Sequence, residues 1–334
     1  MKHDYKKALL RCSILAMIIG VVIIIVAVME NTALKDPDSA SSHPGATDYL
    51  HQRETVYING EPYIRRKGVS TLLFIGLDTY GKAMGSDSYN NSEKADFLAL
   101  AVFDDERKCY TILHLNRDTM ADVTMLDING KEMGTVYEQL AIAHTYGDGL
   151  AVSCKNTAKA VSDYLYGIEI KNYISVTMDA ISLITDYIGG VTVTIEEDMT
   201  AIDSEFTAGS TITLKGEKAL KFVRARGQLE DSSNLARMKR QKQYIAAFFD
   251  ALSAKKVTDT FIMGAFERVS EYSVTNCEAS FFASAGRGLR DYTYKGAISP
   301  DGEAIVGEKY MEFYADEEDL LSIITDLFYE RTDD

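Results

Sequence analysis

The sequence predicts a layered α/β domain that stands outside a membrane on a single N-terminal transmembrane helix. Three observations support this fold class. An uncharged apolar run fills residues 12–29, apolar runs of strand length lie at residues 71–77, 97–103 and 110–115, and long helical patterns follow them. Strands mixed with helices are typical of domains in which helices cover a sheet.

The apolar run at residues 12–29 contains no charged side chain, and the apolar residues 8–10 extend it. About 20 apolar residues are needed to cross a bilayer core. Four basic side chains precede the run, whereas acidic side chains dominate the start of the segment that follows. Because positive charge stays inside, residues 1–11 should be a cytoplasmic tail and the main domain should be extracytoplasmic. The alternative is a cleaved secretion signal, but the run is long for a signal core and no clean small-x-small site follows it.

The segment after the predicted anchor divides into a stalk and a lead-in. Residues 30–50 hold two prolines and a Ser/Ala/Asp-rich stretch, which indicates a flexible stalk. Asn59-Gly60, within residues 51–69, is the type I′ turn signal and predicts a β-hairpin. The main domain is then expected at residues 70–255. Its near-continuous apolar strands should be covered on both faces.

Helical patterns alternate with further strand signals in the main domain. Gly189-Gly190 ends one helix before a strand at residues 191–195. A C-terminal extension is expected at residues 256–334, with helical stretches near residues 278–289 and 316–329. The main-domain helices are predicted at residues 149–166, 178–188, 215–223 and 235–254.

Composition and missing motifs exclude several classes of protein. The net charge of −15 argues against general nucleic-acid binding. The five histidines have no metal-type spacing, and no Walker A motif, Gly-rich dinucleotide loop or GxSxG elbow is present. Outside the apolar run lie Cys109, Cys154 and Cys277, and an odd count with wide spacing does not make a disulfide framework. They are expected to be three buried thiols, with a Cys109–Cys154 bridge as the alternative.

Two aspartates lie at the ends of neighbouring predicted strands. Asp78 follows the strand at residues 71–77, and Asp96 opens the strand at residues 97–103. Ligands and catalytic groups gather at the carboxyl ends of strands in α/β sheets. Two carboxylates there could share a hard cation such as Mg²⁺, which binds oxygen ligands. The alternative is that each aspartate is a turn or capping residue.

Basic side chains form two further candidates for the site. Arg117 follows the third strand directly, where a catalytic or binding group would be expected. The alternative is that Arg117 and Asp118 form an ordinary surface ion pair. Between residues 221 and 242 the local charge reverses, since only Glu230 and Asp231 oppose a run of seven basic residues. Arginine suits bidentate binding of phosphate oxygens, while a solvated basic face is the alternative. The seven basic residues are Lys221, Arg224, Arg226, Arg237, Lys239, Arg240 and Lys242.

The predicted helix at residues 235–254 carries a mixed stripe. Asn234, Arg237 and Gln241 fall on one face, and Tyr244 and Phe248 continue it. An amphiphile with a charged head and an apolar tail would need such a stripe. A helix whose lower half lies in the core has the same pattern.

These motifs, taken in order, resemble those of the LytR–CpsA–Psr family of bacterial cell-envelope proteins. The resemblance covers about residues 70–255, and the predicted anchor and stalk match the family layout. The tail at residues 314–318 resembles the extension of clostridial-type members. The ordered set is Gly76-Leu77-Asp78, Lys94-Ala95-Asp96, Asn116-Arg117-Asp118-Thr119, and then residues 143–147, 187–191, 216–220, 223–226 and 237–241.

The resemblance implies a three-layer α/β/α sandwich with a central mixed sheet and an apolar channel for a lipid chain. It implies a Mg²⁺-dependent phosphotransferase at the membrane. This enzyme moves a phosphate-linked glycopolymer from undecaprenyl pyrophosphate to peptidoglycan or a similar acceptor. No nucleic-acid partner is expected. By the same resemblance, Asp78 and Asp96 would hold the metal, and Arg117 and Asp96 would be catalytic. Asp231 is a further catalytic candidate because of its position near Asn234. The pyrophosphate would be bound by Lys94, Arg117, Arg224, Arg226, Arg237 and Gln241.

Two departures from the family pattern motivate a rival hypothesis. The family usually has Arg where Lys94 stands and Asp where Asn234 stands. If that carboxylate acts as a base or orients a partner, Asn234 cannot replace it, and Asp231 is the acid one turn of loop away. The rival is a non-catalytic polyprenyl-phosphate binder that regulates or scaffolds envelope assembly. A simple lipid pyrophosphate phosphatase is a third hypothesis.

Overall fold

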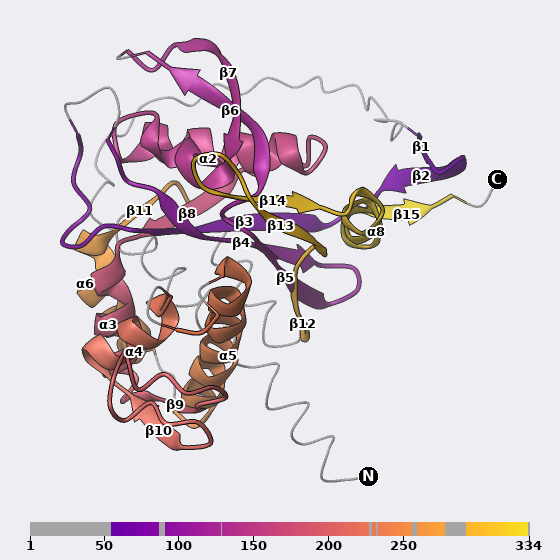
Figure 1. Ribbon diagram of the computed structural model, residues 1–334. Coiled ribbons are helices and arrows are strands. Elements are labelled where there is room, and N and C mark those ends of the chain that lie inside the picture. Colours follow the sequence, from indigo (N-terminus) through magenta and orange to yellow (C-terminus); the bar gives the residue numbers. More distant parts are fainter. Residues whose placement is uncertain are drawn as a thin grey trace, which may run out of the picture.

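The computed structural model describes residues 55–86, 91–127, 129–226, 229–231, 233–255, 259–277 and 292–332 (Figure 1). The predicted cytoplasmic tail, transmembrane helix and stalk, within residues 1–50, lie outside the described residues, as does the helical stretch expected near residues 278–289. None of the helices that the structure describes is long and apolar enough to cross a membrane.

A six-stranded mixed sheet lies at the centre of the molecule. Three adjacent strands contain the three predicted apolar runs, and the central one of these is antiparallel to both of its neighbours. The outer pairs include parallel neighbours, because β8 runs parallel to β3 and β12 runs parallel to β5. In sheet order, the strands are β11 (Ser273–Thr275), β8 (Asn172–Val176), β3 (Val69–Leu77), β4 (Ala95–Asp104), β5 (Cys109–Leu115) and β12 (Thr293–Ile298).

One face of this sheet packs against three helices. They are α3 (Met178–Tyr187), α4 (Gly216–Arg224) and α5 (Asn234–Ser253). Ala99 and Ala101 of β4 belong to the core on this side, together with buried side chains of all three helices. The helices therefore cover the face that Figure 1 shows below the sheet.

The opposite face packs against η1 (Leu140–Thr145), α2 (Ala151–Tyr164) and α8 (Glu317–Phe328). Leu98 and Leu100 of β4 belong to this second core. Successive side chains of a strand point to opposite faces, so β4 supplies both cores by turns. Burial on both faces is why the middle strands are apolar throughout. The prediction of a central mixed sheet with helices is confirmed.

The lead-in hairpin is tied to the C-terminus. β1 (Val56–Ile58) and β2 (Glu61–Arg65) pair antiparallel, and β15 (Tyr329–Arg331) joins the free edge of β2. Asn59 and Gly60 have φ values of 52° and 81°. Both positive angles are those of a type I′ turn, so the predicted hairpin is present.

Three smaller antiparallel pairs project from the central layers. They were not predicted as hairpins, and two of them lie next to the site described below. They are β6 (Met120–Leu126) with β7 (Glu132–Gln139), β9 (Val191–Thr194) with β10 (Thr211–Leu214), and β13 (Gly302–Val306) with β14 (Met311–Ala315).

Residues beyond 255 were expected to form an extension, yet the described part of them is built into the fold. After α6 (Asp259–Val269) and η2 (Ser270–Tyr272), the chain supplies both edge strands of the central sheet. It then supplies α8, which packs in the second core. The predicted boundary at residue 255 therefore does not separate these elements from the sheet.

The described cysteines are Cys109, Cys154 and Cys277, and all three are free and buried. The prediction of buried thiols is confirmed, and the alternative of a Cys109–Cys154 bridge is wrong. Burial raises the pKa of the Cys154 thiol to about 12, which keeps it protonated.

Candidate functional site

A bulge in β4 places the first acid of the site. Gly76 of β3 pairs with Phe97 and the next residue, Leu77, pairs with Ala95, so Asp96 is the extra residue between them. Bulges of this kind re-aim a side chain next to a functional site. Asp96 is therefore turned out of the regular alternation of β4 at the end of the sheet.

Asp96 links two arginines from distant parts of the chain. Arg237 Nη1 lies 2.9 Å from Asp96 Oδ2, and Arg117 Nη1 contacts Asp96 Oδ1. Arg117 Nε also lies 3.2 Å from Asp118 Oδ1. The Arg117 side chain is only 13% exposed, so the alternative of a solvated surface pair is wrong. Breaking a buried pair of this kind leaves an uncompensated charge and is costly.

Positive charge accumulates around Arg237. Burial, followed by the nearby charges of Arg117 and Arg226, lowers the pKa of Arg237 to about 10, and Arg224 contributes in the same direction. The guanidinium remains protonated at neutral pH, so the mutual repulsion of these cations is retained. A bound polyanion would relieve this repulsion, and bidentate arginine forks match phosphate oxygens.

The side chain of Arg237 is held by an amide network. Asn234 Oδ1 accepts hydrogen bonds from Arg237 Nε, at 3.0 Å, and from Arg237 Nη2. On its other side, Asn234 Nδ2 donates to Asn116 Oδ1, which also accepts from the Asp118 backbone N–H at 3.0 Å. Both asparagines are buried. Asn234 therefore orients Arg237 through an oxygen that an amide supplies as well as a carboxylate would.

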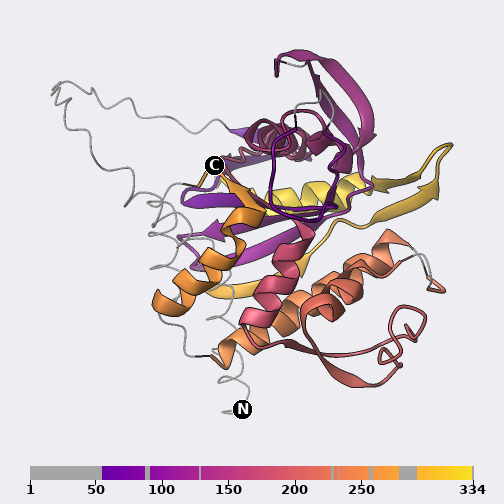
Figure 2. The same ribbon diagram turned by 90° about the vertical axis from the view of Figure 1, so that its left-hand side faces the viewer.

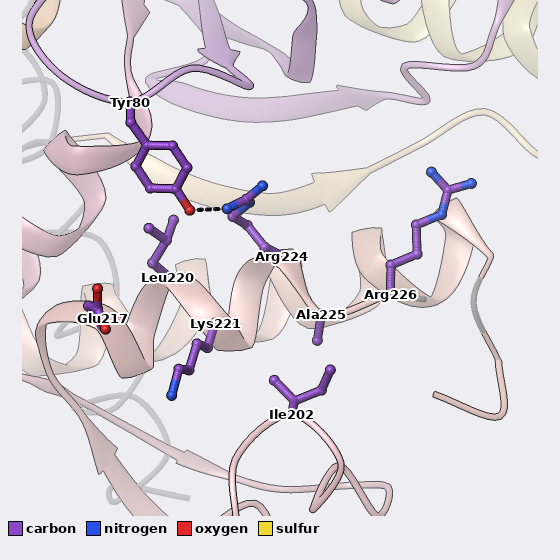
Figure 3. Close-up of a pocket in the computed structure, with 8 residues that line it drawn as sticks. All are labelled: Tyr80, Ile202, Glu217, Leu220, Lys221, Arg224, Ala225 and Arg226. Carbon is purple, nitrogen blue, oxygen red and sulfur yellow. Dashed lines mark hydrogen bonds between the residues drawn. The ribbon is translucent and has the colours of Figure 1, made fainter. Parts of the chain in front are cut away.

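The remaining predicted arginines lie at the C-terminal end of α4 (Figure 3). Figure 3 shows Arg224 and Arg226 pointing to one side of this segment, whereas Lys221 points away. Arg224 donates a hydrogen bond to the Tyr80 hydroxyl and its guanidinium lies 5.2 Å from the centre of the ring. These residues line a cavity of about 570 Å³. Tyr80 was missed in the sequence, where only its position two residues after Asp78 pointed to it.

A second, apolar cavity of about 190 Å³ lies between the sheet and α5. Gln241 is its main polar lining group, and its side-chain amide reaches Val223 O at 3.4 Å. The stripe predicted on α5 is therefore split between the arginine site and this apolar pocket. The other lining residues are Phe74, Ile75, Gly76, Phe97, Ile174, Val176, Ile181, Val223, Tyr244 and Ile245.

Two predicted residues have other roles. Asp231 is exposed and accepts a hydrogen bond from the Ser233 backbone N–H at 2.9 Å, near the start of α5. It lines a different cavity, of about 360 Å³, together with Arg240. The prediction of Asp231 as a substitute carboxylate finds no support in this placement. Arg240, although part of the basic run, is buried and bonded to Glu197 and to the Ala225 carbonyl, so it is structural.

The metal-binding prediction rests on Asp78 and Asp96. Asp78 Oδ1 accepts a hydrogen bond from the Lys94 backbone N–H at 2.8 Å, so one oxygen of Asp78 acts as a capping group. The Lys94 side chain is exposed. In the described part of the chain, no group of three or more His, Cys, Asp or Glu side chains could hold a metal ion. Mg²⁺ commonly takes only one or two protein carboxylates and completes its shell with phosphates and waters.

A further carboxyl group, that of Glu93, lies near Asp78. Burial, and then the charge of Asp78, raise the pKa of Glu93 to about 7. The Glu93 and Asp78 carboxylates therefore lie close enough to interact. Asp78 and Asp96 are the carboxylates that would hold Mg²⁺ here, although both oxygens of Asp96 also contact arginines.

Strand β14 and Gln139 of β7 together hold Asp118, which pairs with Arg117. Gln139 Nε2 donates to Asp118 Oδ1 at 2.8 Å and to the Met311 carbonyl at 2.7 Å. The Phe313 backbone N–H donates to the Asp118 carbonyl at 2.9 Å. Sequence reasoning missed this support, because nothing local links residues so far apart.

Comparison with known proteins shows the family to which this chain belongs. The model described as the LytR_cpsA_psr family matches residues 31–323. The polyisoprenyl-teichoic acid–peptidoglycan teichoic acid transferase TagU of Enterococcus faecalis is 26% identical over 70% of this chain and 69% of its own length. Biofilm regulatory protein A of Streptococcus mutans is 27% identical over 75% of this chain and 62% of its own length.

Solved structures have the same fold. B. subtilis TagT matches with a TM-score of 0.56 and 20% identity, over 78% of this chain and 90% of that chain. TagT bound to LIIa-WTA gives a TM-score of 0.57 and 21% identity over the same shares of the two chains. At this level of identity, the likeness shows the fold.

Proposed function

Because this chain belongs to the LytR–CpsA–Psr family, we propose that it transfers a phosphate-linked glycopolymer from a polyprenyl pyrophosphate to peptidoglycan or another cell-surface acceptor. One observation carries the proposal: Asp96 bridges Arg117 and Arg237 while Gln241, one turn further along α5, lines an apolar pocket. A charged head and an apolar tail need these two environments side by side. The name of the E. faecalis relative supports the substrate class.

The lipid-linked substrate, the donor of the glycopolymer, would bind through its pyrophosphate and through its polyprenyl chain. Its pyrophosphate would lie among Arg117, Arg224, Arg226 and Arg237, where an anion relieves the repulsion that lowers the pKa of Arg237. The start of its chain would enter the apolar pocket. Since the pocket of about 190 Å³ is smaller than typical ligand sites, it would hold only the first part of a polyprenyl chain.

In the reaction, an acceptor hydroxyl oxygen attacks the phosphorus that carries the glycan. A new oxygen–phosphorus bond forms, and the bond from that phosphorus to the bridging oxygen breaks. The electron pair leaves with the lipid phosphate, and the hydroxyl proton passes to water. Phosphoryl transfer through a loose transition state depends mainly on positioning and charge stabilisation. Arg117 and Arg237 supply that charge, and Asp96 fixes both of them in place.

We further propose that Asp78 and Asp96 hold Mg²⁺, which when bound neutralises charge on the phosphate oxygens. Chelation should then abolish transfer and Mg²⁺ should restore it. Asp78→Asn should raise the Mg²⁺ concentration needed for half-maximal rate. Full activity of the parent in a chelator would refute the metal requirement and leave the arginine assignment intact.

The network around Asn234 removes one ground for the rival binding function. Asn234 keeps the hydrogen bonds to Arg237 that a carboxylate would make, so the departure from the family pattern does not remove an orienting group. The transferase hypothesis therefore needs no carboxylate at this position.

The test uses the full chain in detergent with a lipid pyrophosphate-linked glycan, a peptidoglycan acceptor and Mg²⁺. Arg117→Ala and Asp96→Ala should each lower the rate by roughly 10²–10³-fold, as removal of a preorganised electrostatic group does. Lys239→Ala is the matched control, since Lys239 lies on α5 in an exposed pair with Glu196. The product should be a glycan–phosphate–acceptor adduct.

Three outcomes would contradict the proposal. Variants as fast as the parent would refute the site assignment. Free phosphate as the main product would favour the phosphatase hypothesis. Lipid retained by the protein, with no turnover under any metal, would favour the binder.

We also propose that residues 12–29 anchor the chain, so that the site meets its lipid substrate at the outer membrane surface. Deletion of residues 1–29 should release the protein from membranes. Alkaline extraction should not release the full chain, and release by alkali would contradict an anchor.

A further inference from the structure

Two antiparallel hairpins stand next to the arginine site and carry exposed aromatic side chains. Figure 2 shows both projecting beyond the central sheet, β6–β7 in magenta and β13–β14 in yellow. Tyr137 on β7 is 56% exposed, and Tyr314 on β14 is 39% exposed. Tyr310 precedes β14. We call these three tyrosines, with the carboxylates Asp122, Glu138 and Glu312, the tyrosine platform.

Carboxylates surround the tyrosine rings. The Tyr314 hydroxyl donates to Glu312 Oε2 at 2.8 Å, and the Tyr310 hydroxyl is hydrogen-bonded to Glu138. Asp122 lies directly opposite Tyr137 in the β6–β7 register. These hydrogen bonds restrict the Tyr310 and Tyr314 side chains, while Tyr137 and Tyr314 both keep exposed surface. Single exposed apolar side chains are ordinary, but a cluster next to a site marks an interaction surface.

Open rings beside carboxylates fit a carbohydrate. A pyranose has apolar C–H faces, which pack on aromatic rings, and a rim of hydroxyl groups, which donate hydrogen bonds to carboxylates. Rings that are already restricted lose little side-chain entropy when a ligand packs against them. The platform therefore has both kinds of group that a neutral sugar chain needs.

Charge separates the platform from the donor's binding region. The platform has three carboxylates, whereas Arg117, Arg224, Arg226 and Arg237 are cationic. A phosphate-bearing polymer would be attracted to the arginines and repelled by the platform. The platform is suited to the reactant that carries no phosphate.

The platform is joined to the reacting groups by direct contacts. Gln139, two residues after Tyr137 on β7, donates to Asp118, which pairs with Arg117. Phe313, the residue before Tyr314, donates its backbone N–H to the Asp118 carbonyl. A chain lying on the platform would therefore lie beside the residues that hold Arg117.

We propose that the tyrosine platform binds the acceptor glycan and presents its hydroxyl to the phosphorus near Arg117. This inference rests on the proposed transferase function. It assigns to the β6–β7 and β13–β14 hairpins a specificity for neutral, polyhydroxylated chains.

The first test measures binding without chemistry. Chitotetraose is titrated into the full chain in detergent by calorimetry. Tyr137→Ala and Tyr314→Ala should each weaken binding by about tenfold, in the range of an aromatic contact. Tyr137→Phe and Tyr314→Phe should stay within about threefold of the parent, because the ring faces carry the contact. Tyr57→Ala, at an exposed tyrosine of β1, is the control.

The second test measures turnover. In the alanine variants the KM for the acceptor should rise by about tenfold, while the KM for the donor and donor hydrolysis without acceptor stay unchanged. Binding of chitotetraose by Tyr137→Ala or Tyr314→Ala as tight as by the parent would overturn the platform. So would binding of a phosphate polymer that depends on these tyrosines. Platform-dependent glycan binding with no donor turnover in the parent would instead reject the transferase function and leave the platform standing.

Discussion

The amide pair Asn116–Asn234 makes a counterintuitive prediction: restoring the carboxylate usual in the family, by Asn234→Asp, should damage this protein. In the parent, Asn234 Nδ2 donates to Asn116 Oδ1. An aspartate has no donor there and would place an oxygen against an oxygen. If the Asn116 amide turned to donate instead, the Asp118 backbone N–H would lose the acceptor that now lies 3.0 Å away.

Either response removes one buried hydrogen bond. Asn116 is 3% exposed and Asn234 is 6% exposed, so water cannot replace the lost partner easily. An unsatisfied buried polar group costs about 1–3 kcal/mol. A stronger, charge-assisted bond from Arg237 to the new carboxylate offsets part of this cost. We expect a net loss of about 1–2 kcal/mol in the free energy of unfolding.

A double-mutant cycle isolates the cause. Asn234→Asp, Asn116→Ala and the double variant are unfolded in urea, and activity is measured in parallel. Because Asn116→Ala removes the opposing oxygen, the double variant should be more stable than the sum of the two single changes, by about 0.5–3 kcal/mol. Additive changes, or an Asn234→Asp protein at least as stable as the parent, would refute the reasoning from the amide network.

Three further changes probe other parts of the molecule. Burial lowers the pKa of His144 to about 4 and of His114 to about 3, so their contribution to stability should be full above pH 6.5 and fall below it, by about 1.4 kcal/mol per pH unit for each histidine. The raised pKa of Glu93 offsets part of this fall, because protonation of Glu93 favours the folded state. The measurement is Tm between pH 7 and 4.5, where a flat profile would contradict it. Gly76→Ala should lower the free energy of unfolding by about 1–3 kcal/mol and weaken lipid binding, because the new Cβ would lie 2.9 Å from Phe97 Cβ at the apolar pocket. Unchanged affinity for a polyprenyl phosphate would argue against that pocket. Phe313→Ala should lower the free energy of unfolding by about 3–5 kcal/mol and lower kcat, since this buried ring anchors the strand whose backbone bonds to Asp118. An unchanged kcat in folded protein would show that this strand is not needed to position Asp118.

The parts of the fold that the sequence predicted are those with a strong local signal. β3, β4 and β5 are buried on both faces, so their apolar runs stand out. The edge strands β11 and β12 are short and only partly buried, and their mixed composition gave no such signal. The hairpins β6–β7 and β13–β14 were also missed, since β7 and β13 are largely exposed and carry no apolar run, and with them the tyrosine platform was missed.

The candidate site divides in the same way. Arg117 and Asp96 could be identified because each lies at the end of a predicted core strand. Asp231 was chosen because it is near Asn234 in sequence, but the start of α5 turns it toward a different cavity. Proximity along a loop does not fix the direction of a side chain.

The sequence by itself determined the chemical types present: carboxylates at strand ends, arginines in a basic run, an apolar stripe on α5 and a mixed α/β core. Only the tertiary structure decided which of them meet. Arg237 reaches Asp96 across 141 residues, and a single bulge in β4 turns that aspartate toward it. Local patterns follow from backbone periodicity, which neighbouring residues set. Long-range pairs follow from how two faces of a sheet are covered, and that depends on packing of the whole chain.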